Sequence, residues 1–455
     1  MSYDNSKQQA YKLNSEIVNS IITAVRHKNK AEFNRLFGSL HVADKADLLE
    51  QISRNERRML INLWGNAIEG LVLRELELGI RDEIIEELDQ NVIIKVLKTL
   101  ETDDIVHLIE DIDPHEQLKL IKSLPNKLKI AVKYALEYQA SSAGRLMQRE
   151  IVTVPEHFDV GNAIDLMRSR ENLPNDFYEI IIVDPKFHPK GVVSLGKLMA
   201  SKRNVILEDI SSKTFRSIPA TQSQEDVAYA FNQYHMVSAP VINKEGRLVG
   251  VITIDDAIKI LEDETEEDMK KMVGLGDEEL SDSVIEIVKN RFPWLMTNLL
   301  TAILASVVIA QFATTIEALV ALAVLMPIVA SMGGNAGTQT VTVAVRALAT
   351  RDLTNSNSLR VIYREILVGL LNGCIFSIIM GSVGFAWFQN FYLGIILGLA
   401  MICNMLIAAF SGILLPLGLT KAGIDPALSS TVFLTTLTDI VGFFVFLGLA
   451  SWFLL

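Results

Sequence analysis

One carboxylate stands alone in the last apolar segment of the chain. Asp439 lies near the middle of residues 426–455, which carry no other charged side chain. An ionised carboxylate at mid-membrane depth costs roughly 2.5–3.5 kcal/mol on insertion scales, so such a group normally faces water and binds a cation. Asp439 therefore predicts a cation pathway. The hydroxyls that could add oxygen ligands beside it belong to Thr431, Thr435, Thr436 and Thr438.

A second polar group interrupts another apolar segment, at residues 333–340. The sequence there is Gly-Gly-Asn-Ala-Gly-Thr-Gln-Thr, and Pro327 precedes it. Glycines allow helices to approach closely, and helix packing alone would explain them. Asn335 and Gln339 are expected at membrane depth only where they meet protein or water. We therefore expect freed backbone carbonyls and a wet or protein-lined environment here.

A third cluster consists of acids that precede the apolar segments. Glu264, Glu267 and Asp268 are spaced three and four residues apart, so on a helix they share one face. Like charges on one face repel each other unless a cation binds them. A solvated helix face is the alternative interpretation. The position of the cluster between folded domains and the membrane favours a cation site.

Five segments are long enough to cross a bilayer, and each holds roughly 20 apolar residues. They must position Asp439 and the polar residues of the 333–340 segment. The charged residues after the second and fourth segments are basic, whereas Glu317 is the only charge after the first and third. Basic loops stay inside, which predicts a multi-pass protein of the plasma or inner membrane with a cytoplasmic N-terminus and an external C-terminus. The segments are residues 293–312, 319–348, 366–388, 393–419 and 426–455.

The odd number of spans also bears on assembly. The sequence has no inverted repeat that would let one chain enclose a symmetric path. We therefore expect a homodimer with two-fold symmetry in the lipid bilayer. The sequence points to no obligatory protein partner.

Charge excludes other classes of function. The formal net charge of −12 lies entirely in the first 292 residues, because charges of the two signs balance after that point. An acidic surface argues against nucleic acid and favours cations, although it can simply keep a domain soluble. The histidines all lie in the first part of the chain and form no metal-ligand spacing or nucleophile pair, so an enzyme is not expected.

The first part of the chain consists of short amphipathic helices. Thr102 opens one of them, and Asp113 before Pro114 is a helix cap. The spacing of similar units predicts stacked helical hairpins over residues 1–140, resembling a small solenoid.

Residues 141–261 change to short β-branched runs that alternate with helices, in the order of two β-α-β-β-α units. They resemble a tandem pair of CBS domains, a module that often binds adenine nucleotides such as ATP. That resemblance places Thr253 near phosphate and Asp256 near ribose, whereas the first unit has Lys197 where an aspartate is expected. The expected strands are residues 151–154, 179–183, 191–194, 216–218, 239–242 and 248–253.

Three motifs resemble the MgtE family of magnesium channels. They are GGNAGTQ at residues 333–339, Asp-Pro-Ala-Leu at residues 425–428, and the Thr438-Asp439 pair. The resemblance covers nearly the whole chain. It implies a multidomain membrane protein with an all-α superhelical N-domain, an α/β CBS pair, a connecting helix and an α-helical membrane domain. Their expected ranges are residues 1–140, 141–261, 262–291 and 292–455.

The resemblance further implies a homodimeric, Mg²⁺-selective channel that cytoplasmic Mg²⁺ closes. Thr431 and Lys259 depart from residues that relatives carry in the pore and sensor. A secondary exchanger of divalent cations and a CBS-regulated receptor without transport remain alternatives. The matching pore residues are Asp439 and Asn335, and the matching sensor acids are Asp256, Glu264, Glu267, Asp268 and Asp425, with Asp103 and Asp104 in the N-domain.

Overall fold

The computed structural model divides the chain into two compact units, which we describe separately. The first unit is Met1–Asp263 with Glu279–Ser281, and the second is Glu264–Glu278 with Asp282–Leu455. The cap expected at Asp113 lies outside the described residues. The structure describes residues 13–64, 69–110, 112, 114–170, 173–174, 177–276, 278, 283–354, 356–428 and 430–454.

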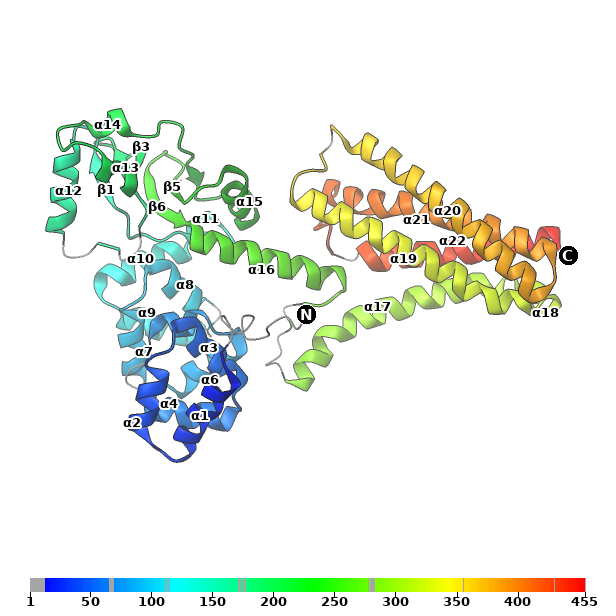
Figure 1. Cartoon of the computed structure of the whole chain (residues 1–455), viewed down its shortest axis with the longest axis horizontal. Helices are drawn as coiled ribbons and strands as arrows, with labels where there is room; N and C mark the ends of the chain where they lie inside the picture. Colours follow the sequence, from blue (N-terminus) through cyan, green and yellow to red (C-terminus); the bar gives the residue numbers. More distant parts are fainter. Residues whose placement is uncertain are drawn as a thin grey trace, which may run out of the picture. The chain divides into compact units, whose positions relative to one another are not determined.

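The first unit begins with short helices joined by tight turns, as the sequence predicts (Figure 1). Asparagine side chains open the first two: Asn14 accepts a hydrogen bond from the Glu16 amide, and Asn29 accepts one from the Glu32 amide. The helices are α1 (Ser15–Arg26), α2 (Lys30–Phe37), α3 (Val42–Gln51), α4 (Arg54–Trp64), α5 (Gly70–Arg74), α6 (Leu78–Glu87), α7 (Gln90–Leu97), α8 (Thr102–Ile109), α9 (Pro114–Ser123) and α10 (Asn126–Leu136).

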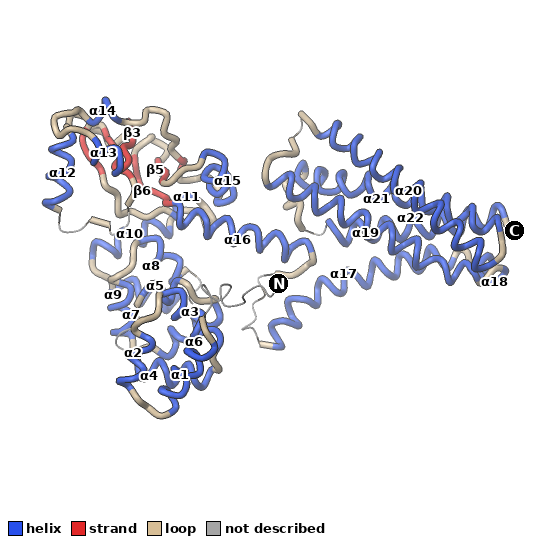
Figure 2. Tube along the Cα trace, viewed as in Figure 1, coloured by secondary structure: helices blue, strands red, loops and turns tan. Residues whose placement is uncertain are grey.

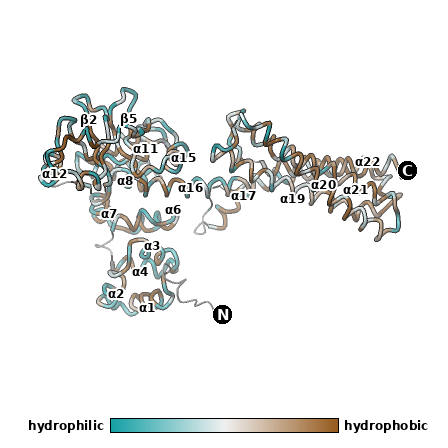
Figure 3. The backbone as a smooth tube through the Cα atoms, turned by 45° about the horizontal axis from the view of Figure 1, so that its top comes forward, coloured by the Kyte–Doolittle hydropathy of each residue, from teal (hydrophilic) through white to brown (hydrophobic). Residues whose placement is uncertain are grey.

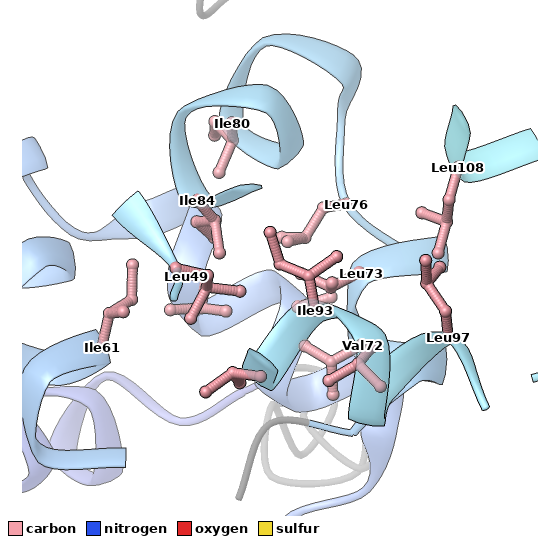
Figure 4. Close-up of a cluster of buried hydrophobic side chains, with 14 of the residues drawn as sticks. Leu49, Ile61, Val72, Leu73, Leu76, Ile80, Ile84, Ile93, Leu97 and Leu108 are labelled. Carbon is pink, nitrogen blue, oxygen red and sulfur yellow. The ribbon is translucent and has the colours of Figure 1, made fainter. Parts of the chain in front are cut away.

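One continuous apolar core holds these helices together. Figure 4 shows part of it, where Leu49, Leu73 and Ile84 from three different helices lie among other buried aliphatic side chains. Each helix is too short to be stable alone, so packing of its apolar face supplies most of its stability. This core fixes the position of α8, which carries the expected sensor acids of the N-domain.

Two small sheets follow, and they contain all the strands of the described residues (Figure 2). In each sheet the middle strand pairs parallel with the first and antiparallel with the third. The predicted strands are confirmed, to within two residues at their ends. The elements are α11 (Ala143–Leu146), β1 (Thr153–Pro155), α12 (Val160–Ser169), β2 (Glu179–Val183), β3 (Pro189–Ser194), α13 (Leu195–Ala200), α14 (Leu207–Ile210), β4 (Ile218–Pro219), α15 (Gln224–Tyr234), β5 (Ser238–Ile242), β6 (Leu248–Thr253) and α16 (Ile254–Met272).

The helix after β6 does not end with the CBS pair. α16 runs without a break for 19 residues and carries both the motif residue Asp256 and the acidic face at Glu267. Strong helix formers fill its second half, which explains why nothing interrupts it. The connecting segment is therefore the continuation of the last CBS helix, followed by a separate helix from Val284.

The second unit contains five helices of the described residues that are long and apolar enough to cross a membrane, which confirms the predicted spans. Figure 3 colours them mostly white to brown, the apolar end of its scale. The first starts earlier than predicted and continues through Pro293 as one helix. The short helix α18 was not predicted. The helices are α17 (Val284–Ala310), α18 (Ala313–Ala318), α19 (Ala321–Ala349), α20 (Ser358–Phe388), α21 (Phe391–Lys421) and α22 (Ser430–Phe453).

The expectation of freed carbonyls in α19 is wrong. The helix is continuous across Pro327 and residues 333–340, and neighbouring hydroxyls bond its carbonyls: Thr338 Oγ1 donates to the Gly334 carbonyl at 2.9 Å. Two of its glycines serve packing. A Cβ at Gly333 would lie 2.1 Å from Nδ2 of the buried Asn404, and one at Gly337 would lie 2.6 Å from a methyl of Leu434.

Candidate cation pathway and acidic clusters

The polar residues of α22 form one stripe. Thr431, Thr435 and Asp439 are four residues apart, so their side chains follow one face of the helix. Asp439 is half-buried, and within the described part of the chain it forms no ion pair or hydrogen bond. These apolar helices thus hold an oxygen-lined stripe that ends in an uncompensated carboxylate.

α19 lies against this stripe at its glycines. A Cβ at Gly334 would come within 3.8 Å of the Thr435 methyl, so the small residue brings the α19 backbone close to α22. Asn335 follows it and is exposed, with its Nδ2 3.4 Å from Ser331 Oγ. Gln339 instead lines a cavity of about 140 Å³ with Asn372 of α20. Asn335 and Gln339 thus lie one turn apart on the same continuous helix, and Gln339 in addition faces α20.

The end of α16 contacts the first turn of α22. Thr431 Oγ1 donates to the Met272 carbonyl, and the Met272 side chain packs against an apolar cluster that includes Val341, Ala427 and Leu434. The departure at position 431 thus has a structural role here, because the threonine hydroxyl caps the last turn of α16.

A lysine joins two of the expected sensor acids. Lys271 Nζ lies 2.8 Å from Asp425 Oδ2 and also pairs with Glu267, one turn earlier on α16. Burial opposes the charge of this lysine, but the hydrogen bonds that it donates to Asp425 and Glu267 raise its pKa. Glu264 and Asp268 are partly exposed on the same helix. The second unit therefore brings together Glu267 and Asp425, with a protein cation between them.

An arginine joins the expected sensor acids of the first unit. Arg74 Nη1 lies 2.8 Å from Asp104 Oδ1, and its Nη2 lies 3.2 Å from Asp256 Oδ1. Burial raises the pKa of both carboxyls, and the arginine only partly offsets this effect. Oδ1 of Asp103 is buried without a hydrogen bond from the described residues. Burial and the Asp256 charge raise the pKa of Asp103 well above its usual range.

The same contacts occupy the expected nucleotide half-site. Thr253 is buried and donates to Asp256 Oδ2 at 2.8 Å, so the second carboxylate oxygen of Asp256 is also bonded inside the protein. Lys259, one turn further on, donates to the Arg74 carbonyl at 3.2 Å and lies 3.7 Å from Glu75. In this arrangement, Thr253 and Asp256 serve the contact between the helical region and the CBS pair.

Neither acidic cluster is a preformed metal site. Over the described ranges, no three acidic, histidine or cysteine side chains converge closely enough to hold an ion. The clusters carry more carboxylates than cations, yet protein cations occupy their centres. A metal ion would have to displace Arg74 or Lys271, or draw the acids together.

Sequence reasoning missed both cations. Lys271 had a visible signal, since it follows Glu267 by one helical turn. Arg74 had none, because its partner Asp256 lies 182 residues away.

Five membrane-length helices, a carboxylate stripe among them and acidic domains before them define a membrane transport protein for cations. The chain belongs to the MgtE family. The family model described as a divalent cation transporter matches residues 326–449, the MgtE intracellular N domain matches residues 40–141, and CBS domains match residues 143–203 and 207–263. The chain is accordingly a transport protein and not an enzyme.

Relatives support this membership across most of the length. The chain is 32% identical to the magnesium transporter MgtE of Enterococcus faecalis over 323 residues, which cover 71% of each chain. It is 33% identical to that of Thermus thermophilus over 334 residues, or 72% of this chain and 73% of the relative. A solved cytosolic domain of the Mg²⁺ channel MgtE in complex with ATP matches 53% of this chain and 99% of its own length, with a TM-score of 0.51 and 25% identity.

Proposed function

We propose that this chain forms a homodimeric channel for Mg²⁺ that cytoplasmic Mg²⁺ closes. The observation that carries the proposal is the stripe of Thr431, Thr435 and Asp439 on one face of α22, with no protein cation at its carboxylate in the described structure. A carboxylate held in this way at membrane depth needs a passing cation to offset its cost. One stripe supplies oxygens from one side, and a second copy would complete the ring.

The ligand chemistry favours Mg²⁺. The stripe and the exposed Asn335 offer only oxygen atoms as ligands, and Mg²⁺ prefers oxygen ligands while it keeps much of its water. Soft metals such as Cu⁺ prefer sulfur. The magnesium transport named for the relatives agrees with this choice.

Closure would act through the last turn of α16. This turn rests on Thr431 at one end of the stripe, and Lys271 ties it to Asp425. Mg²⁺ bound by Glu264, Glu267, Asp268 and Asp425 would hold α16 in place, and Asp103, Asp104 and Asp256 would act similarly in the first unit. Loss of Mg²⁺ would leave these acids repelling each other and release α16.

The CBS pair is the proposed site for an adenine nucleotide. The solved cytosolic domain of a similar channel contains ATP. In this chain Lys197 replaces the acid of the first half-site. Nucleotide at the second half-site would have to break the hydrogen bond from Thr253 to Asp256 and displace Arg74 from Asp256.

Orientation follows from the basic loops. We propose a cytoplasmic N-terminus and an external C-terminus, because the basic side chains at Arg351 and Lys421 are expected inside. A cysteine added after Leu455 should react with an impermeant thiol reagent in intact cells. One at position Asn357 should stay protected, and the opposite labelling would contradict the orientation.

The transport proposal is tested in liposomes that contain the full-length protein and a Mg²⁺ indicator. A channel gives flux that follows the Mg²⁺ gradient and membrane potential and falls when Mg²⁺ bathes the cytoplasmic face. Flux that requires a proton or sodium gradient would instead identify an exchanger. Absence of flux, with nucleotide binding retained, would favour the receptor.

The sensor is tested separately. Replacement of Glu264, Glu267 and Asp268 by alanine should weaken the Mg²⁺ dependence of protease protection at the end of α16. The wild type should become protected from the protease at millimolar Mg²⁺ concentrations, which are typical of weak sites with oxygen ligands. A midpoint that does not change would mean that this helix face is only solvated.

A further inference from the structure

A cavity of about 450 Å³ lies between the helical region and the first CBS domain, beside the first turn of α8. Its volume falls in the range of small-molecule sites, roughly 300–1,000 Å³. α8 and α10 form one side, and the segment before β1 and the end of α12 form the other. The lining residues that matter here are Thr102, Lys127, Arg149, Glu150 and Arg170.

Three of these residues are cations without a carboxylate partner. Among the described residues, no acid lies within ion-pair distance of Lys127, Arg149 or Arg170. Arg74 and Lys259 of the same unit, by contrast, both reach acids. Three cations and one carboxylate give this lining two net positive charges.

Arg149 is the least satisfied of the three. Its guanidinium lies over the Tyr134 ring, 5.7 Å from the centroid, and its Nε is buried without a hydrogen-bond acceptor in the described structure. Burial lowers the pKa of this arginine. The buried Nε has lost water that no acceptor in the described chain replaces.

Glu150 does not serve as the anionic partner of the Arg149 guanidinium. Its carboxylate accepts the Thr102 hydroxyl at 2.8 Å, the Thr102 amide at 3.3 Å and the Arg149 amide at 3.0 Å. These neutral donors use its lone pairs and fix it on α8. The guanidinium of Arg149 is left for a group from outside the chain.

We propose that this cavity, the Arg149 cavity, binds a small phosphate-bearing anion. Two net positive charges match a phosphate group, and the arginine forks supply paired donors for its oxygens. The apolar remainder of the lining, with Leu128 and Ile151, would contact the rest of a larger ligand. A bound anion would join α8 and α10 to the segment before β1. It would thereby link the helical region to the CBS pair independently of metal.

The test uses full-length protein in detergent without divalent cations, and calorimetric titration with pyrophosphate and with AMP. Arg149→Gln should weaken binding on the order of tenfold or more, as expected for lost hydrogen bonds to a charged group. Arg170→Gln and Lys127→Gln change exposed residues, so they should weaken binding by several-fold and leave folding intact. Arg168→Gln is the matched control, since Arg168 is exposed on the same helix outside the lining.

Binding of pyrophosphate alone, or of both probes, with this pattern supports the proposal and separates an inorganic anion from a nucleotide. Binding of AMP that none of the three variants changes would place the nucleotide at a CBS half-site and overturn it. Absence of binding of either probe at millimolar concentration would also overturn it. Neither result affects the proposed transport of Mg²⁺.

Discussion

The carboxylate in the membrane helices and the carboxylates of the acidic clusters have opposite surroundings. Asp439 has no protein cation near it in the described structure, whereas Asp104 and Asp256 share Arg74, and Glu267 and Asp425 share Lys271. An acid without a partner depends on a mobile ion. An acid with a tethered cation is already partly neutralised, so a metal must compete for it. The first arrangement suits conduction of an ion. The second suits a sensor that responds only when the Mg²⁺ concentration is high enough to compete with the protein cation.

We expect the largest effect from a substitution that removes the charge at Asp439. Asp439→Asn keeps the shape of the side chain. It should reduce Mg²⁺ flux into liposomes roughly a hundredfold, because a carboxylate about 5.5 Å from a hydrated divalent cation contributes about 3 kcal/mol at an effective dielectric near 40, between the values for protein and for water. Asp352→Asn makes the same change in an exposed loop and should leave flux unchanged. Wild-type flux in the Asp439 variant would contradict the pore assignment.

The second prediction removes a tethered cation. The Arg74 side chain is 18% exposed and its partner Asp104 only 7%, and removal of one partner of a buried pair typically costs about 3 kcal/mol or more. Arg74→Gln should therefore lower hydrogen-exchange protection of α8 in the full-length protein by roughly a hundredfold without Mg²⁺.

Added Mg²⁺ should restore more of this protection in Arg74→Gln than in the wild type. Arg54→Gln is the control, because Arg54 is 70% exposed in its pair with Glu83. Equal protection in the Arg74 variant and the wild type would mean that the arginine adds nothing to the contact.

The third prediction concerns pH. Burial and the neighbouring Glu150 charge raise the pKa of Glu101 from its usual 4.5 to about 7. Because the folded form binds the proton more tightly, its contribution to stability is complete below about pH 4.5 and is lost as the pH rises through about 7. The melting temperature of the full-length protein should fall over this window.

Glu101→Gln should flatten that pH dependence, measured by scanning fluorimetry. The exposed Glu86→Gln should leave it as it is in the wild type. The same slope in Glu101→Gln and the wild type would assign the effect to other acids, with Asp103 the first to examine.

The smallest expected effect is at Lys271. Its side chain is 30% exposed and that of Asp425 is 35% exposed, and exposed ion pairs contribute only about 0.2–1 kcal/mol. Lys271→Gln should speed hydrogen exchange at the end of α16 by at most about fivefold without Mg²⁺. It should also shift the Mg²⁺ midpoint to lower concentration, since the competitor for Asp425 is gone.

Lys270→Gln is the matched control for this variant. Lys270 pairs with Glu266, one turn earlier on the same helix. A midpoint that moves equally in both variants would reflect net charge rather than competition at Asp425.

The sequence was most informative where a local pattern carries the information. Strands β2 and β6 begin and end at the predicted residues, because a short run rich in β-branched residues is a signal that depends only on near neighbours. The same holds for the membrane spans, where length and hydropathy are sufficient. Pro293 and Pro327 were misleading, since apolar helices tolerate proline when their neighbours support the backbone.

By itself, the sequence determined that an acid lies in a membrane helix, that acids share one face of α16, and that the chain resembles a channel family. Apart from the pair of Glu267 and Lys271, which helical spacing predicts, only the tertiary structure decided which cation each acid meets. Arg74 reaches Asp256 across 182 residues, and Lys271 reaches Asp425 across 154. No local pattern records such pairs, because they form only when packing of apolar faces brings distant helices within a few ångströms of each other.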